Sequence, residues 1–227
     1  AASDVYKRQG IFGGSLYFFT ENTALGITQA SNVSFIICTA PLLTTILSLL
    51  FYKSEKASKG LIYGSLLALM GVGLIVFNGS FVLKISPIGD LLTLLAALSW
   101  AFYSLIIKKM AGRYPTVFIT RKIFFYGVLT ILPSFLLHPL HPDTVVLLQP
   151  AVLFNLLFLA VLASLICYVL WNVVLKQLGT VRASNYIYLN PLVTMITSFL
   201  ILDEKITLVA LGGAACIVCG VYWAEKK

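Results

Sequence analysis

The sequence predicts an all-α membrane protein with eight transmembrane helices, and three observations lead to this fold class. First, 59% of the 227 residues are hydrophobic and only 11% are charged, whereas soluble domains have about 45–50% apolar and about 25% charged residues. Second, apolar segments recur along the whole chain, and most approach the ~20 residues that a membrane-spanning helix needs. Third, these segments do not alternate with period two, as the strands of a membrane β-barrel would.

The composition also excludes several classes of protein, namely a soluble enzyme, a disordered chain and a nucleic-acid-binding domain. The net charge is +8, but the basic residues stand between apolar segments and form no continuous basic face. We therefore expect the lipid bilayer, and no nucleic acid, as a partner. The eight expected spans are Gly10–Gln29, Asn32–Tyr52, Gly60–Asn78, Gly89–Ile107, Thr116–Leu137, Ala151–Leu175, Ala183–Leu202 and Thr207–Ala224.

The first span has one face of small and polar residues, which points at other helices or at a cavity rather than at lipid. These residues recur at steps of three and four positions and are Gly14, Tyr17, Glu21, Ala24 and Thr28. Glu21 is the only acidic residue well inside a span, where a charge costs ~2.5–3.5 kcal/mol on insertion scales. Two interpretations stay open: Glu21 binds a substrate amine or carries a coupling proton, or it is a neutral packing residue that pairs with Asn22.

The second and third spans are marked by a proline and by small residues. Pro41 removes a backbone donor and predicts a kink, which is either a passive bend or a hinge. Small residues at every fourth position are typical of close helix packing, and they also allow a homodimer face. They are Gly60, Gly64 and Ala68 in the third span, with Gly212, Cys216 and Gly220 in the eighth.

The fourth and sixth spans each have a face of aromatic and polar residues. The fourth carries Trp100 and Ser104, with Tyr103 beside them, and the sixth carries Tyr168 and Asn172. Such a lining suits an amphipathic organic solute, although ordinary packing explains each residue as well. In the fifth span, Arg121 and Lys122 either snorkel to the headgroups or contact an anionic group at a gate.

The seventh and eighth spans repeat the second and third. Pro191 follows Pro41 by 150 residues; a charged cluster follows each proline-containing span, at 53–56 and at 203–205, and a glycine-rich helix comes next. The two copies cross the membrane in opposite directions. An inverted repeat of this kind is typical of secondary transporters, whose site lies between the halves near the bilayer midplane.

The repeat predicts two domains, a first repeat of three helices over residues 10–79 and a second of five over 87–225. The fourth and fifth spans have no counterpart in the first copy, so two N-terminal helices of the complete arrangement are expected to be missing. Residues 1–9 are polar, lack an initiator methionine and have no signal-peptide layout. We expect them to be a non-native or disordered leader.

The basic residues predict the orientation. Of the 16 Lys and Arg residues, all but Lys84 and Lys205 fall on the side where the chain begins. This asymmetry places both termini in the cytoplasm by the positive-inside rule, in a plasma or inner membrane.

Three segments resemble a known family. The stretch GDLLTLLAALSWAFYS at 89–104, the stretch ASNYIYLNP at 183–191, and Asp203–Glu204 with Gly212, Gly213 and Gly220 are similar to the EamA-type transporters of the drug/metabolite transporter superfamily. The resemblance covers Gly10–Trp223. It implies a ten-helix, five-plus-five inverted repeat that usually exports metabolites such as amino acids; this chain shows eight of those helices.

The predicted function is therefore a multi-pass secondary transporter that exports a small organic metabolite, an amino acid or a drug-like solute, by alternating access. The alternatives are a channel or scaffold without active transport and, less favoured, an intramembrane enzyme. Pro41 and Pro191 are the candidate hinges. The candidate substrate-binding residues are Tyr17, Glu21, Asn22, Trp100, Tyr103, Tyr168, Asn172, Tyr188 and Asn190.

We expect no cofactor, no metal and no enzymatic activity. The chain has no P-loop for ATP. Cys216 and Cys219 have the spacing of a zinc knuckle but no second pair, and His138 and His141 lie in a loop that two prolines interrupt.

Overall fold

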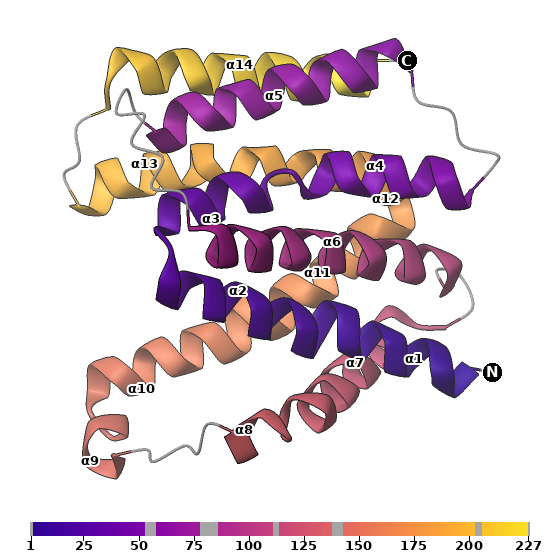
Figure 1. Ribbon diagram of the computed structural model, residues 1–227, viewed down its shortest axis with the longest axis vertical. Helices are drawn as coiled ribbons and strands as arrows, with labels where there is room; N and C mark the ends of the chain where they lie inside the picture. The colour runs from indigo at the N-terminus through magenta and orange to yellow at the C-terminus, as the bar shows by residue number, and fades with distance from the viewer. Residues whose placement is uncertain are drawn as a thin grey trace.

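The computed structural model describes residues 2–52, 58–77, 86–110, 114–137, 143–202 and 206–226 (Figure 1). The charged clusters at 53–56 and 203–205, and the pair His138 and His141, lie outside the described residues. The described part of the chain is an assembly of helices, with no strand pairing into a sheet. It confirms the predicted all-α fold class.

The helices of the first half are α1 (Ala2–Gly10), the π-helical turn η1 (Ile11–Ser15), α2 (Leu16–Ile27), α3 (Ala30–Ile37), α4 (Ala40–Phe51) and α5 (Lys59–Phe77). Those of the second half are α6 (Pro87–Met110), α7 (Thr116–Ile131), α8 (Ser134–Leu137), α9 (Thr144–Leu147), α10 (Pro150–Leu157), the π-helical η2 (Phe158–Ile166), α11 (Cys167–Leu178), α12 (Thr180–Asn185), the 3₁₀ segment η3 (Tyr186–Leu189), α13 (Asn190–Leu202) and α14 (Leu208–Glu225).

Five helical stretches in the described residues are long and apolar enough to cross a membrane. They are Ala30–Phe51, Lys59–Phe77, Pro87–Lys109, Pro150–Leu178 and Leu208–Glu225. The other three predicted spans are also largely helical but are shorter, interrupted or more polar. Helix α7 ends shortly before Pro133, α13 follows a 3₁₀ segment, and α2 carries Glu21 and Asn22.

The predicted leader is folded in the structure rather than disordered. Residues Ala2–Gly10 form α1, which runs without a break through η1 into α2. Gln9 is fully buried, and Val5 packs against a core cluster that includes Ile119 and Ile123 of α7. Residues 2–10 are therefore helical where the sequence predicts a non-native or disordered leader.

Two spans are broken next to their prolines. Helix α3 ends at Ile37, and α4 begins again with Pro41 in its first turn; Pro41 has no N–H to donate to the carbonyl of residue 37. In the second half, α12 passes into the 3₁₀ segment η3 before α13 begins with Asn190 and Pro191. Both predicted kinks thus coincide with irregular helical hydrogen bonding, a turn at 38–39 and a 3₁₀ segment at 186–189.

The glycine-rich helices α5 and α14 pack against each other in close contact. A Cβ atom on Gly64 would lie 2.5 Å from the carbonyl oxygen of Gly220, and one on Gly220 would lie 2.6 Å from that of Gly64. Gly71 and Gly213 form a second reciprocal pair, at 2.5 and 2.7 Å. These glycines are needed because any side chain would force the two backbones apart, so this part of the small-residue stripe is used within the chain.

The remaining helices are stacked beneath this pair (Figure 1). Helix α4 packs against α12, α6 packs against both α2 and α4, and α7 packs against α1. Helix α1 begins and α14 ends on the same side of the bundle. The stretch α10–η2–α11 is the least covered, since only 6% of its most apolar window is buried, against 50% for α6.

Candidate functional site

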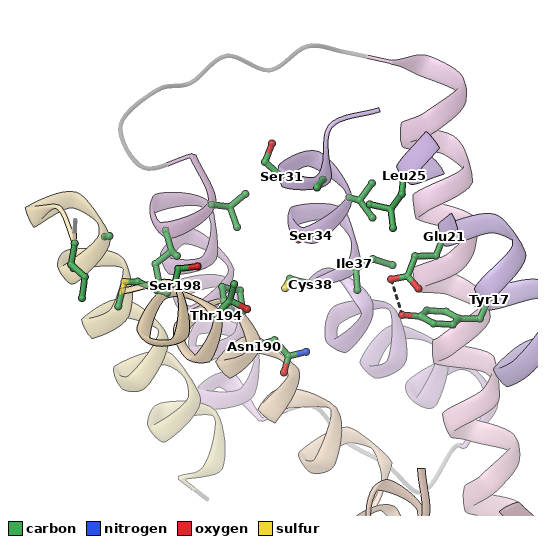
Figure 2. Close-up of a pocket in the computed structure, with 18 residues that line it drawn as sticks. Tyr17, Glu21, Leu25, Ser31, Ser34, Ile37, Cys38, Asn190, Thr194 and Ser198 are labelled. Atoms are coloured by element: carbon green, nitrogen blue, oxygen red, sulfur yellow. Dashed lines mark hydrogen bonds between the residues drawn. The ribbon is translucent and has the colours of Figure 1, made fainter. Parts of the chain in front are cut away.

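A cavity of about 550 Å³ lies between the two broken spans (Figure 2). Helices α2 and α3 line it from the first half, and α13 lines it from the second, with parts of α5 and α14. Its walls are Tyr17, Glu21, Leu25, Ala30, Ser31, Val33, Ser34, Ile37, Cys38, Ile75, Val76, Asn190, Pro191, Thr194, Met195, Ser198, Ile206 and Ala210. A cavity of this size accommodates a small organic solute.

Glu21 and Tyr17 form one wall of the cavity. They lie one turn apart on α2, and the Tyr17 hydroxyl donates a 3.1 Å hydrogen bond to Oε1 of Glu21 (Figure 2). Glu21 is the only charged side chain among the described lining residues. Both residues belong to the face of the first span that the sequence predicts to point away from lipid. This face therefore contributes to a cavity.

Hydroxyl and amide groups line the other walls. On α13, Asn190, Thr194 and Ser198 follow one another at four-residue steps and so face the same way. On α3, Ser31 and Ser34 are three residues apart and also line the cavity (Figure 2). Apart from Asn190, none of these polar residues was among the predicted site residues, although the four-residue repeat after Pro191 was a visible signal.

Four of the predicted aromatic residues pack together with Trp171 in a group that we call the aromatic cluster: Tyr17, Trp100, Tyr103, Tyr168 and Trp171. The ring of Trp100 is central, since its centroid lies 5.1 Å from Tyr17, 5.2 Å from Tyr103, 5.9 Å from Tyr168 and 5.8 Å from Trp171. These distances are typical of interacting aromatic pairs. Only Tyr17 of this cluster also lines the cavity.

Hydrogen bonds hold the aromatic cluster in place. The Tyr103 hydroxyl donates to Oδ1 of Asn172 at 3.0 Å, and Nδ2 of Asn172 donates to the Thr120 hydroxyl at 3.0 Å. The Tyr168 hydroxyl donates to the carbonyl of Gly13 at 2.6 Å. The bonds join α6, α11, α7 and η1, and Tyr103 is fully buried.

The structure thus divides the nine predicted site residues into three groups. Tyr17, Glu21 and Asn190 line the cavity. A second group, made of Trp100, Tyr103, Tyr168 and Asn172, lies behind Tyr17 and does not line it.

The last two predicted residues lie elsewhere. Asn22 is exposed and bonds back to the carbonyl of Phe18 at 2.7 Å, so it does not pair with Glu21. Tyr188 is fully buried in a separate core cluster with Cys38 and Ile217. Of the predicted hinges, Pro191 lines the cavity and Pro41 is buried near it.

Comparison with known proteins agrees with this architecture. An uncharacterized transporter of Archaeoglobus fulgidus is 30% identical over 218 residues, which are 95% of this chain and 73% of that protein. A probable amino-acid metabolite efflux pump of Salmonella typhimurium is 29% identical over 182 residues, which are 76% of this chain and 60% of that protein. A crystal structure with 20% identity has the same fold, with a TM-score of 0.80 over 97% of this chain and 75% of the other.

The family model of EamA-like transporters matches residues 8–77 and 87–224, which is nearly the whole chain. This match confirms the resemblance that the sequence motifs indicated. The protein is thus an integral membrane protein, and it belongs to the EamA-like transporter family.

Proposed function

We propose that the protein is a secondary transporter that exports a small organic metabolite across the cell membrane by alternating access. One observation carries this proposal: the cavity lies between two spans that are both broken beside a proline. Discontinuous helices around a central site are the usual construction of secondary transporters, because helix ends there can bind a solute and shift relative to each other. The relatives named as amino-acid metabolite efflux pumps favour amino acids or related amines as substrates.

An inverted repeat supports the proposal. In an inverted repeat, Gly64 would correspond to Gly213 and Gly71 to Gly220. The two-fold relation would then turn the contact between Gly64 and Gly220 into a contact between Gly213 and Gly71, and both contacts are present. Reciprocal contacts of this kind are what a two-fold relation between halves produces. Helices α6 and α7 have no counterpart in such a repeat. The uncovered surface of α10–η2–α11 is where two counterpart helices would pack in the ten-helix arrangement.

Alternating access also requires that the cavity be closed on one side. The cavity residues on α2, α3 and α13 lie toward the ends of the helices that are far from both chain termini, and the aromatic cluster lies on the other side of Tyr17. With both termini in the cytoplasm, the cavity faces outward and the aromatic cluster blocks the cytoplasmic side. We assign Tyr17, Glu21 and Asn190 to substrate contact and the remaining members of the cluster to this closure.

The test is solute counterflow with the purified protein in proteoliposomes. A saturable uptake that an excess of the same solute inside accelerates is expected of a carrier. Flux that is linear in concentration and lacks exchange would instead indicate a channel, and absence of flux with every solute would indicate a scaffold. Glu21→Gln serves as the site variant, and a pH dependence that the variant retains would exclude Glu21 as the carrier of a coupling proton.

A further inference from the structure

The charges around the cavity are unequal. Glu21 is acidic, and no Lys, Arg or His is among the described residues that line the cavity. Three basic side chains of the bundle contact other groups: Arg182 lies 3.9 Å from Glu225, Lys108 lies over the ring of Tyr52, and Arg121 lies over that of Phe118. Within the described residues, the field inside the cavity is therefore that of a single carboxylate.

The Glu21 carboxylate is only partly satisfied by the protein. Oε1 accepts the hydrogen bond from Tyr17, and no described side chain or backbone group donates to Oε2. A carboxylate in a low-dielectric site is stabilised by a cation that also donates hydrogen bonds. An ammonium group has three donors, so it can bond to Oε2 and still reach other acceptors.

The rest of the cavity suits both the charged and the uncharged parts of such a ligand. The ring of Tyr17 offers a π face to a cation, while Leu25, Ile37 and Ile75 offer an apolar surface. Hydroxyl and amide groups of α3 and α13 can bond to neutral polar groups. A carboxylate on the ligand would find no cationic partner among the described lining residues and would lie in the field of Glu21.

We propose that the cavity selects an organic cation with a protonated amine and no free carboxylate, and that Glu21 is the residue that determines this specificity. The inference rests on the proposed function, since it assigns the cavity to the transported solute. It narrows that function, because a free amino acid becomes a weaker ligand than its decarboxylated or esterified counterpart.

The experiment compares three probes with the same phenyl body: phenethylamine, phenylalanine and 3-phenylpropanoate. Trp100 is the reporter, because its ring lies 5.1 Å from Tyr17. Replacing Trp171 and Trp223 by Phe leaves it as the single tryptophan of the three in the chain. We expect phenethylamine to change the fluorescence at the lowest concentration, with an affinity at least about 10-fold above that of phenylalanine, and no binding of the anion.

Glu21→Gln keeps the size of the side chain and removes its charge, and it is expected to weaken phenethylamine binding by about 10- to 100-fold. Asp90→Asn is the matched control. Asp90 caps the start of α6, where it accepts from the backbone N–H of Ser86 and from the Thr28 hydroxyl, and it does not line the cavity. Asp90→Asn changes the net charge of the protein by the same amount as Glu21→Gln, but it should leave the affinity for phenethylamine within about 2-fold.

The outcomes separate this inference from the transport proposal. Equal binding of phenethylamine and phenylalanine, equal weakening by the two variants, or no binding of any probe would overturn the specificity assigned to Glu21. Counterflow of a zwitterion that Glu21→Gln leaves intact would overturn it too, while the transport function would stand. Selective amine binding without any flux would leave the inference in place and refute the transport function.

Discussion

At the scale of single residues, Asn172 is the polar centre that joins three helices. It accepts from Tyr103 and donates to Thr120, and all three side chains are buried. Inside a membrane protein a hydrogen bond between helices contributes about 0.6 kcal/mol on average and up to about 1.7 kcal/mol. The two bonds of Asn172 therefore hold α6, α7 and α11 together most strongly if they act together.

A double-mutant cycle measures this coupling. Asn172→Leu breaks both bonds and leaves the Tyr103 hydroxyl buried without an acceptor, so the free energy of unfolding in detergent should fall by about 1–3 kcal/mol. Tyr103→Phe should cost about 1 kcal/mol. The double variant should cost less than the sum of the two, because neither partner is then left unpaired. Strict additivity would show that the bond between them contributes nothing.

The sequence indicates which side chains share a helix face but not where that face lies in the fold, and the reason is geometric. Helical spacing identifies the face on which Tyr17 and Glu21 lie, and it puts Tyr103 beside the face of Trp100. Spacing cannot tell which other helix meets that face. Tyr188 and Asn190 are two positions apart and so point to different sides of the helical segment, with Tyr188 buried in a core cluster and Asn190 lining the cavity. The spacing does not say which of these two sides meets the cavity.

At the scale of helices, the contact between α5 and α14 depends on whether a glycine lies on the side of its helix that faces the other helix. Gly71→Ala would place a methyl group 2.5 Å from the carbonyl oxygen of Gly213 and 2.8 Å from the side chain of Ile217. The two helices would have to separate, and we expect a loss of about 1–3 kcal/mol in the free energy of unfolding.

Gly212→Ala is the matched control, since a Cβ atom there meets nothing within 4 Å. Alanine favours the helix over glycine by up to about 1 kcal/mol, so this variant should be neutral or slightly more stable. Thermal unfolding of both variants in the same detergent gives the comparison. Equal stability of the two would mean that the close approach at Gly71 does not hold α5 against α14.

The helix break at Pro191 predicts a change in rate rather than in affinity. Pro191→Ala supplies an N–H that can bond to the carbonyl of Ile187 and continue the helix. If the break is a hinge, counterflow should slow by at least about 10-fold while phenethylamine affinity stays within about 2-fold.

Pro150→Ala provides the control for this substitution. Pro150 lies in the first turn of α10, where a helix needs no backbone donor, so the control should transport normally. Unchanged counterflow in Pro191→Ala would show that the break is a passive bend.

The helices themselves were largely predictable, with two exceptions that have physical causes. Long apolar runs predict a helix at every span, and mid-span prolines predict both breaks. The π-helical segment Phe158–Ile166 was not predicted, because i→i+5 bonding leaves no signal in composition or spacing. The helix at Ala2–Gly10 was also missed, since it is supported by packing against α7 and by the contact of Val5 with a core cluster rather than by its polar sequence.

At the scale of the whole molecule, composition predicts the fold class, and motifs predict the family. The all-helical membrane fold and the family follow from apolar runs and from the pattern of Pro191 and the glycines, and both are confirmed. The orientation stays a prediction from the basic residues. It matters for the mechanism, because the cavity opens outward only if the termini are cytoplasmic.

Labelling of introduced cysteines tests the orientation directly. In a chain whose four cysteines are replaced by alanine, Gln149→Cys lies in the exposed segment before α10 and Ser58→Cys lies just before α5. By the positive-inside rule, Gln149 faces the outside and Ser58, flanked by lysines, faces the cytoplasm. A membrane-impermeant maleimide should therefore label only Gln149→Cys in right-side-out vesicles, and both variants after the vesicles are opened. Labelling of Ser58→Cys alone in intact vesicles would show that the topology is the opposite of the predicted one, with the cavity at Glu21 open to the cytoplasm.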